Sequence, residues 1–372
     1  MAGGIAGTYL VTGGAGFIGR YLCEDLLAQG HRVRVVDGLI DQVHGTGAPR
    51  LSSDVEFIRA DIRDAAAIDT ALVGVDGVFH LAAEVGVGQS MYEIARYVGA
   101  NDLGTAILLE RLIARPVKRL VVASSMSVYG EGSYRKASGG LDGSVRRVLK
   151  DGSAQWDPLD AEGSPLVPVP TDETKPVDLA SVYAVTKFVQ ERNSLIVGRA
   201  YGIEAVALRL FNVFGPGQAL SNPYTGVLAN FGARLLNGQA PLVFEDGRQR
   251  RDFVHVRDVA RAFRLAMERP EAAGHVINIG SGRSYTIGHI AEMLAEAMQV
   301  PELAPQLLGK ARAGDIRHCF ADISKARALL GFSPEHVLED TIDEAAAWIR
   351  SSSAVDRGEH ARSQLEVRGL MA

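Results

Sequence analysis

Short apolar runs alternate with helical patterns along the first part of the chain. Residues 8–12 form an apolar, β-prone run, and an amphipathic helical pattern follows from about residue 17 to residue 29. A second apolar run covers about residues 32–36, and further runs end near residues 58, 80 and 124, with helix-like segments between them. Because strands and helices alternate, the pattern predicts an α/β fold with a parallel, doubly wound sheet of the Rossmann type.

The alternation breaks down after residue 130. Residues 131–170 are rich in Gly, Ser, Pro and Asp and are long for a connection, so we expect an insertion that lies over or beside the active site. A helical pattern returns at about residues 179–200, and an apolar strand at residues 205–210 leads into a Gly-Pro-Gly turn.

These changes of pattern predict two domains and a tail. We expect residues 1–212 to form the dinucleotide-binding domain, including the insertion, and residues 213–350 to form a smaller α/β domain for the substrate. Residues 351–372 are charged and rich in Ser, with little periodicity, and predict a flexible tail. A chain of 372 residues with 47% hydrophobic content can bury a sizeable core.

The composition disfavours several classes of function. The formal net charge of -5 supplies no broad basic surface, so we expect no nucleic-acid partner. Cys23 and Cys319 are the two cysteines, which build neither a disulfide framework nor a four-cysteine metal site, and we expect no metal. The N-terminal residues lack the features of a signal peptide, and no window approaches 18 apolar residues. We therefore expect a cytoplasmic protein without a membrane anchor.

A glycine-rich turn joins the first expected strand to the first helix. Residues 13–19 read Gly-Gly-Ala-Gly-Phe-Ile-Gly, in the strand-to-helix context that a dinucleotide fingerprint requires. The glycines permit a tight turn and the close approach of a pyrophosphate, while the helix N-terminus supplies N–H donors and positive potential. The turn predicts binding of a dinucleotide, with contacts from Gly13, Gly16, Phe17, Ile18 and Gly19.

An acidic residue closes the second expected strand. Asp37 follows Gly19 by 18 residues, where a carboxylate can accept hydrogen bonds from the adenosine ribose hydroxyls. A carboxylate repels a 2'-phosphate, so NAD is favoured over NADP, although the nearby Arg34 leaves a looser preference open. Asp61 and Ile62 end the third strand, where Asp61 is either an adenine-edge contact or a helix N-cap.

A tyrosine and a lysine one helical turn apart indicate acid–base chemistry. Tyr183 and Lys187 lie in the expected helix at residues 179–200, so both side chains project from one face. The pair alone is common by chance, but here it follows a dinucleotide turn and a strand end that contains Ser125. A tyrosine with a pKa of about 10 is a poor base at pH 7, and Lys187 together with a positive nicotinamide ring would favour the phenolate.

With these motifs in this order, the chain resembles the extended short-chain dehydrogenases/reductases, the family of NAD-dependent nucleotide-sugar epimerases and dehydratases. The resemblance runs nearly end to end and rests on Tyr183, Lys187 and residues 13–19, 80–83, 125–130, 209–217, 251–259, 278–282, 312–315 and 321–326. Residues 129–135 and 220–226 further resemble the dTDP-L-rhamnose 4-epimerase subgroup, which is similar to UDP-hexose 4-epimerases. Members of that subgroup often hold paired cysteines in the insertion, where this chain has Lys136, Ala137 and Ser138.

The resemblance implies a role for each matching residue. Tyr183 removes a hydroxyl proton from the sugar while hydride leaves the same carbon, Ser125 hydrogen-bonds the reacting oxygen, and Lys187 supports Tyr183. Further cofactor contacts are implied at Leu81, Ala82, Ala83 and Phe211, in addition to Tyr183 and Lys187. Substrate contacts are implied at Ser125, Ser127, Asn212, Val227, Leu242, Val243, Phe244, Arg251, Arg312, Asp315 and Cys319.

Some of these roles have a simpler alternative. Arg251 and Arg312 suit a diphosphate, but surface or structural ion pairs would also explain them. Ser127 could instead satisfy nearby backbone groups, and Cys319, which matches the gate of the sugar pocket, could be an ordinary buried thiol. Relatives commonly form homodimers through two helices, which correspond here to about residues 91–115 and 180–200.

The residues after Ser125 bear on the type of reaction. Dehydratases of the family carry an Asp-Glu pair there, whereas this chain has Met126 and Ser127, neither of which can act as a carboxylate acid or base. The resemblance therefore implies an NAD-dependent nucleotide-sugar 4-epimerase that acts through a transient 4-keto sugar, on dTDP-L-rhamnose or a related nucleotide hexose. A 4,6-dehydratase or 4-keto reductase of the same family is the alternative, and a non-catalytic NAD-binding protein is a remote one.

Overall fold

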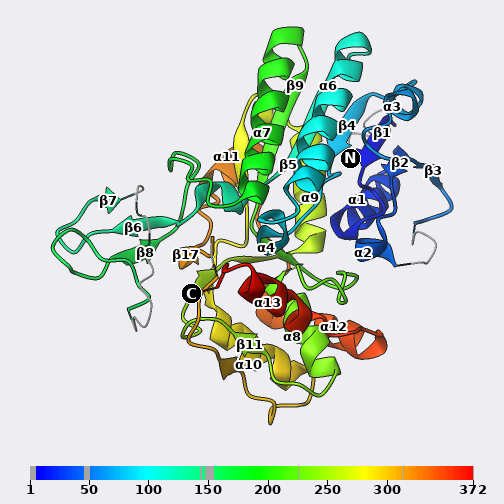
Figure 1. Cartoon of the computed structure of the whole chain (residues 1–372). Helices are drawn as coiled ribbons and strands as arrows, with labels where there is room; N and C mark the ends of the chain where they lie inside the picture. Colours follow the sequence, from blue (N-terminus) through cyan, green and yellow to red (C-terminus); the bar gives the residue numbers. More distant parts are fainter. Residues whose placement is uncertain are drawn as a thin grey trace.

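The computed structural model describes residues 6–45, 51–142, 145, 147, 155–224, 226–312 and 314–371. Several positions named above lie outside these ranges, namely residues 143, 144, 146 and 148–154 of the expected insertion, Thr225, Ala313 and Ala372. Figure 1 shows a sheet flanked by long helices, a smaller helical unit beneath it, and an arm of short strands to one side.

The central element is a seven-stranded parallel sheet in the order β14-β9-β5-β4-β1-β2-β3. In register, Val11 of β1 lies between Val35 of β2 and Phe79 of β4, and all three side chains are fully buried. Burial on both faces explains why these strands read as apolar runs. The predicted doubly wound α/β fold is confirmed, with strands β1 (Thr8–Thr12), β2 (Arg32–Asp37), β3 (Val55–Arg59), β4 (Gly77–His80), β5 (Arg119–Ser125), β9 (Glu204–Leu210) and β14 (Val276–Ile279).

Helices cover both faces of this sheet. On one face, α1 (Phe17–Ala28), α9 (Val256–Glu268) and α11 (Ser324–Leu330) bury Leu22, Phe263 and Leu330 in one core. On the other face, α3 (Ala65–Ala71) and α6 (Gly104–Ala114) bury Ile68 and Leu108 in a second core. The second face also carries α7 (Val182–Tyr201), which packs on β5 and β9, and the connected segments α5 (Ile94–Tyr97) and η1 (Val98–Leu103). Shorter helical turns are α2 (Asp41–His44), α4 (Val87–Ser90), η2 (Met126–Tyr129) and η3 (Pro270–Ala272).

The smaller unit is built from three helices around its own core. Phe231 of α8 (Val227–Leu236), Leu294 of α10 (Ile287–Ala297) and Ile349 of α12 (Leu338–Ser351) are buried together. Short strands form three small sheets in and around this unit: β10 (Asn212–Phe214) with β13 (Phe253–His255), β11 (Leu242–Val243) with β16 (Gln306–Leu307), and β12 (Arg250–Arg251) with β15 (Tyr285–Thr286) and β17 (His318–Cys319).

The chain does not divide into two units at residue 212 as the sequence predicted. After entering the smaller unit, it returns to the first one with α9, which packs against α1, and with β14, which forms the edge of the large sheet. The boundary was placed too early because β14 has four residues and its pairing with β9 joins positions far apart in the sequence. The two units are therefore linked by several crossings of the chain.

The expected insertion forms an antiparallel sheet of β6 (Ser133–Arg135), β7 (Leu141–Asp142) and β8 (Val167–Val169), seen as the arm on the left of Figure 1. The fully buried guanidinium of Arg317 connects this region to the smaller unit, because it binds Asp157 at 2.7 Å, Glu245 at 2.8 Å and Asp246 at 2.6 Å. Arg147 also binds Glu245, at 2.6 Å. A charge network centred on the buried Arg317 and Glu245 thus attaches the insertion to the body of the protein.

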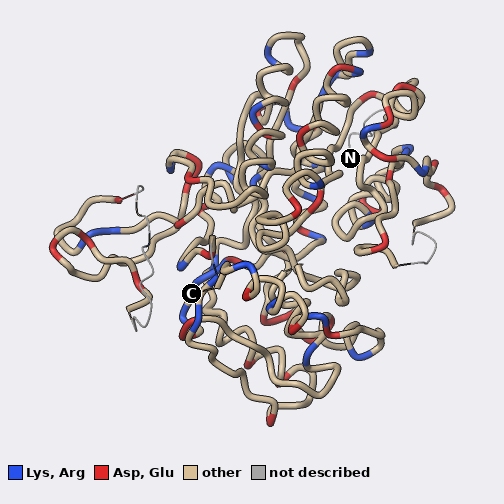
Figure 2. The backbone as a smooth tube through the Cα atoms, viewed as in Figure 1, with Lys and Arg blue, Asp and Glu red and all other residues tan. Residues whose placement is uncertain are grey.

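The expected flexible tail contains a helix, α13 (Gly358–Val367), so that prediction is wrong for these residues. Ala361 and Leu365, one turn apart on this helix, are both buried. Packing of these two side chains stabilises a helix that the weak periodicity of the sequence did not predict. In the described part of the chain, no helix is long and apolar enough to cross a membrane. Figure 2 shows basic and acidic residues interspersed over both units.

Candidate active site

A large cavity of about 1660 Å³ opens between the two units. Its wall runs from the carboxyl ends of the central parallel strands to α8, α12 and α13 of the smaller unit. Sites for one small ligand usually measure roughly 300–1,000 Å³, so this cavity has room for more than one. Ligands of doubly wound sheets bind at the same carboxyl edge.

The glycine turn shapes one end of the cavity. Gly13 has φ +71° and lies against Ala82, where a Cβ would come within 2.7 Å of the backbone nitrogen. A Cβ on Gly19 would lie 2.5 Å from the carbonyl oxygen of Gly13, so α1 can pack on β1 only with glycine there. Gly16 lines the cavity, and a Cβ on it would meet only the Gly13 oxygen, at 3.1 Å. The turn therefore leaves open the space that a pyrophosphate needs at the N-terminus of α1.

Asp37 lies at the same end, at the tip of β2. Its two carboxylate oxygens accept hydrogen bonds from the backbone N–H groups of Ala15 and Leu39, at 3.0 and 2.9 Å. These contacts fix the carboxylate on the cavity wall, where the NAD ribose was expected. Arg34 points elsewhere, because its guanidinium donates to the carbonyl oxygens of Ala71 and Val73, both at 2.7 Å. The residues present fit NAD, and Phe17, Ile18, Asp61, Ile62, Leu81, Ala82, Ala83 and Phe211 line the same cavity.

Three hydroxyl groups meet at the middle of the cavity. Ser125 ends β5, and its Oγ accepts hydrogen bonds from the backbone N–H and the Oγ of Ser127, at 3.2 and 3.0 Å. Ser125 also lies close enough to the phenol of Tyr183 to lower its pKa. The backbone N–H of Tyr183 donates to the Oγ of Ser90 at 3.0 Å, which ties the start of α7 to α4. The structure thus brings Ser125, Ser127 and Tyr183 together on one wall of the cavity.

Burial changes the acid–base properties of the Tyr183/Lys187 pair. It raises the pKa of Tyr183 to about 12, while the neighbouring Ser125 acts in the opposite direction. Burial also lowers the pKa of Lys187 to about 7. The sequence argument considered only nearby cations and left out this desolvation. In the protein alone, Tyr183 is therefore a neutral phenol and Lys187 titrates near neutral pH.

A buried polar network that the sequence reasoning missed holds Lys187. The Nζ of Lys187 donates to the Oε1 of Gln190 at 2.7 Å, and the Nε2 of Gln190 donates to Thr105 at 2.8 Å. Thr105 also bonds to His80, whose other ring nitrogen lies 2.7 Å from the Oγ1 of Thr12. Gln190 lies three residues after Lys187 and faces the sheet, so helical spacing could have indicated it.

A second missed element is an asparagine in the π-helical segment η1. Asn101 is fully buried, and its side chain accepts from the N–H of Glu84 at 2.7 Å and donates to Thr186 at 2.9 Å. It therefore connects the strand-end segment that carries Glu84 to the helix that carries Tyr183. An isolated asparagine within a helical pattern gave no signal for this connection.

Cationic residues line the half of the cavity that faces the smaller unit. The guanidinium of Arg251 donates to the carbonyl oxygens of Arg250, Arg317 and Ile316. These hydrogen bonds fix its orientation, and because carbonyl oxygens carry no formal charge they do not neutralise its positive charge. Arg312 pairs with Asp315 at 2.9 Å and lies over the ring of Phe244, 4.4 Å from its centroid. The other expected substrate residues on this wall are Asn212, Val227 and Leu242.

Two expected substrate residues, Val243 and Cys319, do not line the cavity. Val243 is fully buried in the core of the smaller unit, because neighbouring side chains of a strand point to opposite faces and Leu242 and Phe244 take the cavity side. Cys319 is buried next to Thr171, and a Cβ on Gly132 would lie 3.1 Å from its Cα. Residues at the two ends of the insertion thus cover Cys319, which is a buried thiol and not a gate.

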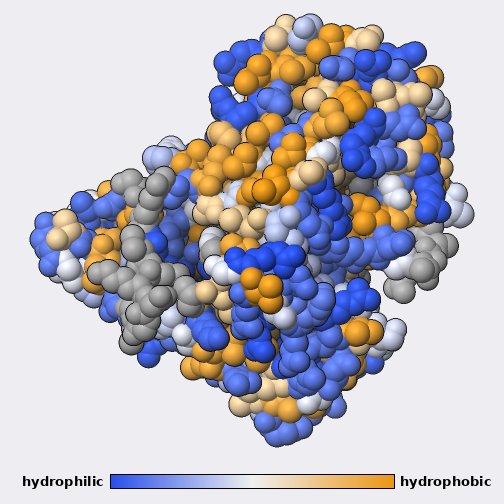
Figure 3. Space-filling model, viewed as in Figure 1, coloured by the Kyte–Doolittle hydropathy of each residue, from blue (hydrophilic) through white to orange (hydrophobic). Residues whose placement is uncertain are grey.

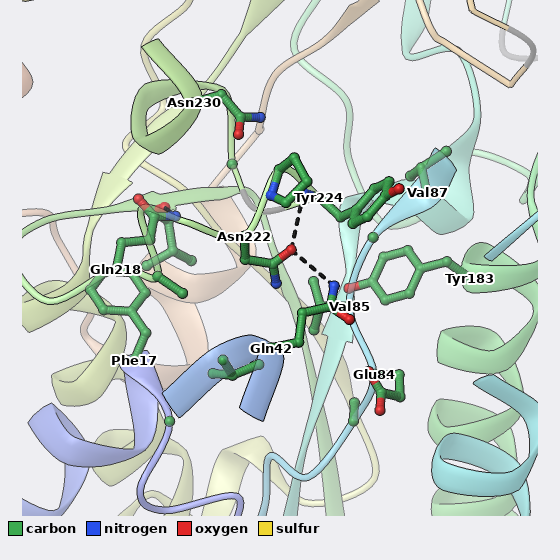
Figure 4. A pocket seen from close by; sticks show the side chains of 18 of the residues that line it. Phe17, Gln42, Glu84, Val85, Val87, Tyr183, Gln218, Asn222, Tyr224 and Asn230 are labelled. Carbon is green, nitrogen blue, oxygen red and sulfur yellow. Dashed lines mark hydrogen bonds between the residues drawn. The ribbon is translucent and has the colours of Figure 1, made fainter. Parts of the chain in front are cut away.

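The cavity is bridged by a contact that joins distant parts of the chain (Figure 4). The Oδ1 of Asn222 accepts hydrogen bonds from the Nε2 of Gln42 at 3.0 Å and from the backbone N–H of Tyr224 at 3.1 Å. Gln42 belongs to α2 beside the glycine turn, and its Nε2 also lies 3.0 Å from the Oε1 of Gln89. No local sequence pattern predicts a contact between residues 180 positions apart.

Comparison with known proteins agrees with this arrangement. Residues 9–280 match the model of the NAD dependent epimerase/dehydratase family. The chain belongs to this family. Within the NAD-dependent epimerase/dehydratase family, the dTDP-L-rhamnose 4-epimerase of Burkholderia thailandensis is 38% identical over 348 residues, which cover 91% of this chain and 94% of that protein.

Solved members of the epimerase/dehydratase family share the fold over nearly the whole chain. A UDP-glucose 4-epimerase of Thermotoga maritima, solved with UDP-glucose, has 31% identity and a TM-score of 0.76, covering 92% of this chain and 99% of that one. A UDP-glucose 4-epimerase of Thermus thermophilus, solved with NAD, has 30% identity and a TM-score of 0.73, covering 93% and 100%. The protein is an NAD-dependent enzyme of this nucleotide-sugar family, as the sequence predicted.

Proposed function

We propose that the protein is a nucleotide-sugar 4-epimerase that acts through a transient 4-keto sugar. The observation that carries this proposal is the set of hydroxyl groups formed by Ser125, Ser127 and Tyr183. Among the described residues, no carboxylate forms a hydrogen bond with any of the three. A dehydratase needs an additional acid and base to eliminate water, whereas an epimerase needs only one group that takes and returns a proton at one oxygen.

Bound NAD would supply the acceptor and donor of hydride at C4, together with a positive ring charge. With that positive charge beside it, Tyr183 would first lose its own proton to solvent. Its phenolate then takes the proton of the C4 hydroxyl and returns it after the sugar has turned. Because burial raises the pKa of Tyr183 to about 12, proton uptake depends on positive charge placed beside it. Ser125 lies beside the phenol and can bind the same oxygen of the sugar.

An epimerase must hold one end of its substrate while the sugar turns at the other. Arg251 and Arg312 offer guanidinium groups on the wall opposite the glycine turn, and a diphosphate accepts such groups in pairs. Burial lowers the pKa of Arg251 because it disfavours the charged form of the guanidinium. A bound anion would stabilise that charged form. We therefore assign these two residues to the diphosphate.

The wall around Tyr183 suits a 6-deoxy sugar. Val85, Val87 and Tyr224 border the same space as Tyr183 in Figure 4 and present mainly apolar surface. A methyl group at C6 packs on such a surface without leaving a hydroxyl unpaired. Together with the 38% identical relative from Burkholderia thailandensis, this favours dTDP-L-rhamnose or a similar nucleotide hexose as the substrate.

A homodimer remains part of the proposal. Ile94, Val98 and Leu103, together with Val185 and Ile196 of α7, are large apolar side chains exposed on the two expected dimer helices. Figure 3 shows apolar surface over this part of the molecule. Two such helices from each subunit would cover one another, and size-exclusion chromatography with light scattering tests this.

A cytoplasmic location also stays a prediction.

The experiment is to incubate the purified protein, without added cofactor, with dTDP-, UDP- and GDP-sugars and to follow products by NMR and the NADH absorbance. The proposal expects a sugar to equilibrate with its C4 epimer without net NADH. A 4-keto-6-deoxy product would instead indicate a dehydratase, and stoichiometric NADH would indicate a dehydrogenase. Tyr183→Phe should retain NAD but lose at least about 100-fold in kcat. Tyr201→Phe, an exposed tyrosine at the end of the same helix, should behave like the wild type.

A further inference from the structure

The helix α13 connects both units at the mouth of the cavity. At its N-terminal end, Asp356 pairs with Arg234 of α8 at 2.9 Å. At the other end, the guanidinium of Arg368 lies over the ring of Tyr92, 4.4 Å from its centroid. Beyond the helix, Met371 forms a β-bridge with Arg312, one of the two residues assigned to the diphosphate. Figure 1 shows α13 between the sheet unit and α8.

One face of α13 is part of the cavity wall. Gly358, Ala361, Arg362 and Leu365 all line it, with the spacing that places side chains on the same side of a helix. The methyl groups of Leu365 lie 3.6 Å from the position that a Cβ on Gly88 would occupy. Gly88 belongs to α4, the turn whose Ser90 holds the backbone of Tyr183, so α13 reaches the segment that supports the reacting group.

Arg362 is the cationic side chain on this face. Its side chain is 35% exposed, but within it Nε is buried and has no hydrogen-bond partner among the described residues. The carboxylate of Glu366 on the same helix forms an ion pair with Nε at 3.8 Å, a distance that is too long for a hydrogen bond. A buried donor without a partner is costly, and a diphosphate bound in the cavity would remove that cost.

We propose that α13 completes the substrate site and that Arg362 donates a hydrogen bond to the diphosphate of the bound nucleotide-sugar. This inference rests on the proposed function, since it takes a nucleoside diphosphate as the anion. Arg362 would thus add a third contact to the diphosphate, from the C-terminal segment, beside those from Arg251 and Arg312. The sugar and diphosphate would then be enclosed on the side that faces solvent.

The test measures binding, not turnover. Isothermal titration calorimetry of the NAD-loaded protein with dTDP, UDP and the corresponding monophosphates gives the affinity contributed by the second phosphate. Arg362→Ala should weaken binding of the preferred diphosphate at least tenfold and reduce its advantage over the monophosphate. Arg362→Lys, which keeps the charge, should retain part of that advantage.

Arg350→Ala is the matched control, because Arg350 is exposed on α12 and its guanidinium donates to the carbonyl oxygen of Ala297, away from the cavity. It should bind both nucleotides like the wild type. If Arg362→Ala keeps the wild-type difference between diphosphate and monophosphate, the assignment of Arg362 is overturned while the proposed function stands. If the wild type binds neither diphosphate, the proposed function fails as well. An equal loss of affinity for monophosphate and diphosphate would show a purely structural role and would also overturn the assignment.

Discussion

The amine of Lys187 donates a hydrogen bond to the side-chain oxygen of Gln190 at 2.7 Å, inside a network that continues to Thr105 and His80. This oxygen is the acceptor that favours the charged form of a lysine whose pKa burial lowers to about 7. Lys187 is therefore held in place, and its charge is sensitive to pH near neutrality. The contact gives Gln190 a positioning role.

Gln190→Leu should lower the pKa of Lys187 further, because it removes the acceptor and leaves the burial unchanged. We expect kcat at pH 8 to fall about tenfold and the alkaline limb of the pH profile to move to lower pH. Steady-state kinetics between pH 6 and 9 measures both. Gln239→Leu, at an exposed position outside the cavity, should leave the profile unchanged. A lower kcat with an unshifted alkaline limb would count against the positioning role.

Substitutions at two glycines of the turn should affect cofactor binding and stability differently. In Gly16→Val the new side chain enters the cavity and meets only the Gly13 oxygen, so NAD affinity should fall at least tenfold with little change in Tm. In Gly19→Val the side chain collides with Gly13 and Gly14 at 2.5 and 2.6 Å, so Tm should fall as well. NAD titration and thermal unfolding of both variants make the comparison. Equal losses of Tm would show that Gly16 is also required for packing.

Acid should destabilise the protein through His80. Burial, with the charge of Lys187, lowers the pKa of His80 to about 3, whereas an unfolded histidine titrates near pH 6.5. Between these values the unfolded chain binds a proton that the folded chain does not. The free energy of unfolding should therefore fall as pH is lowered from 6.5, by up to about 1.4 kcal/mol per pH unit from this group.

Urea unfolding at pH 4 to 7 measures that slope. It should be smaller in His80→Gln than in the wild type, because the group that gains a proton on unfolding has been removed. His360→Gln, at an exposed position of α13, should keep the wild-type slope. Identical slopes for His80→Gln and the wild type would show that His80 is not the origin of the pH dependence.

The buried network at Arg317 should be essential for stability. Arg317→Met leaves Asp157, Glu245 and Asp246 without their shared cation, and the expected cost is about 3–5 kcal/mol. Arg257→Met removes an exposed pair with Glu344 and should cost less than about 1 kcal/mol. Chemical denaturation compares the two variants. Similar costs would mean that the network contributes no more than a surface ion pair.

The sequence predicted those parts of the site that depend on local spacing. The glycine turn, Asp37 at the end of β2, and Tyr183 with Lys187 one helical turn apart all lie on the cavity wall. Their positions follow from the strand–turn–helix order and from the period of a helix, which a single sequence contains.

The remaining features depend on contacts between distant residues. Val243 and Cys319 were assigned by resemblance, but strand alternation turns Val243 into the core and Thr171 covers Cys319. The weak pattern after residue 351 did not show that Ala361 and Leu365 would find a surface to pack on. Burial also shifts the pKa values of Tyr183 and Lys187, and this burial comes from residues far away in the sequence that pack around them in the folded protein.

The late return of the chain to the large sheet has a consequence for its synthesis. When a ribosome has released the first 212 residues, β9 still lacks its neighbour β14, and α1 lacks its covering helix α9. The nucleotide-binding half therefore cannot finish folding until residue 279 has emerged, and by then α8 of the other unit has also been made. Unlike a protein whose N-terminal domain is one continuous segment, this enzyme completes its first half only after part of the second has been synthesised.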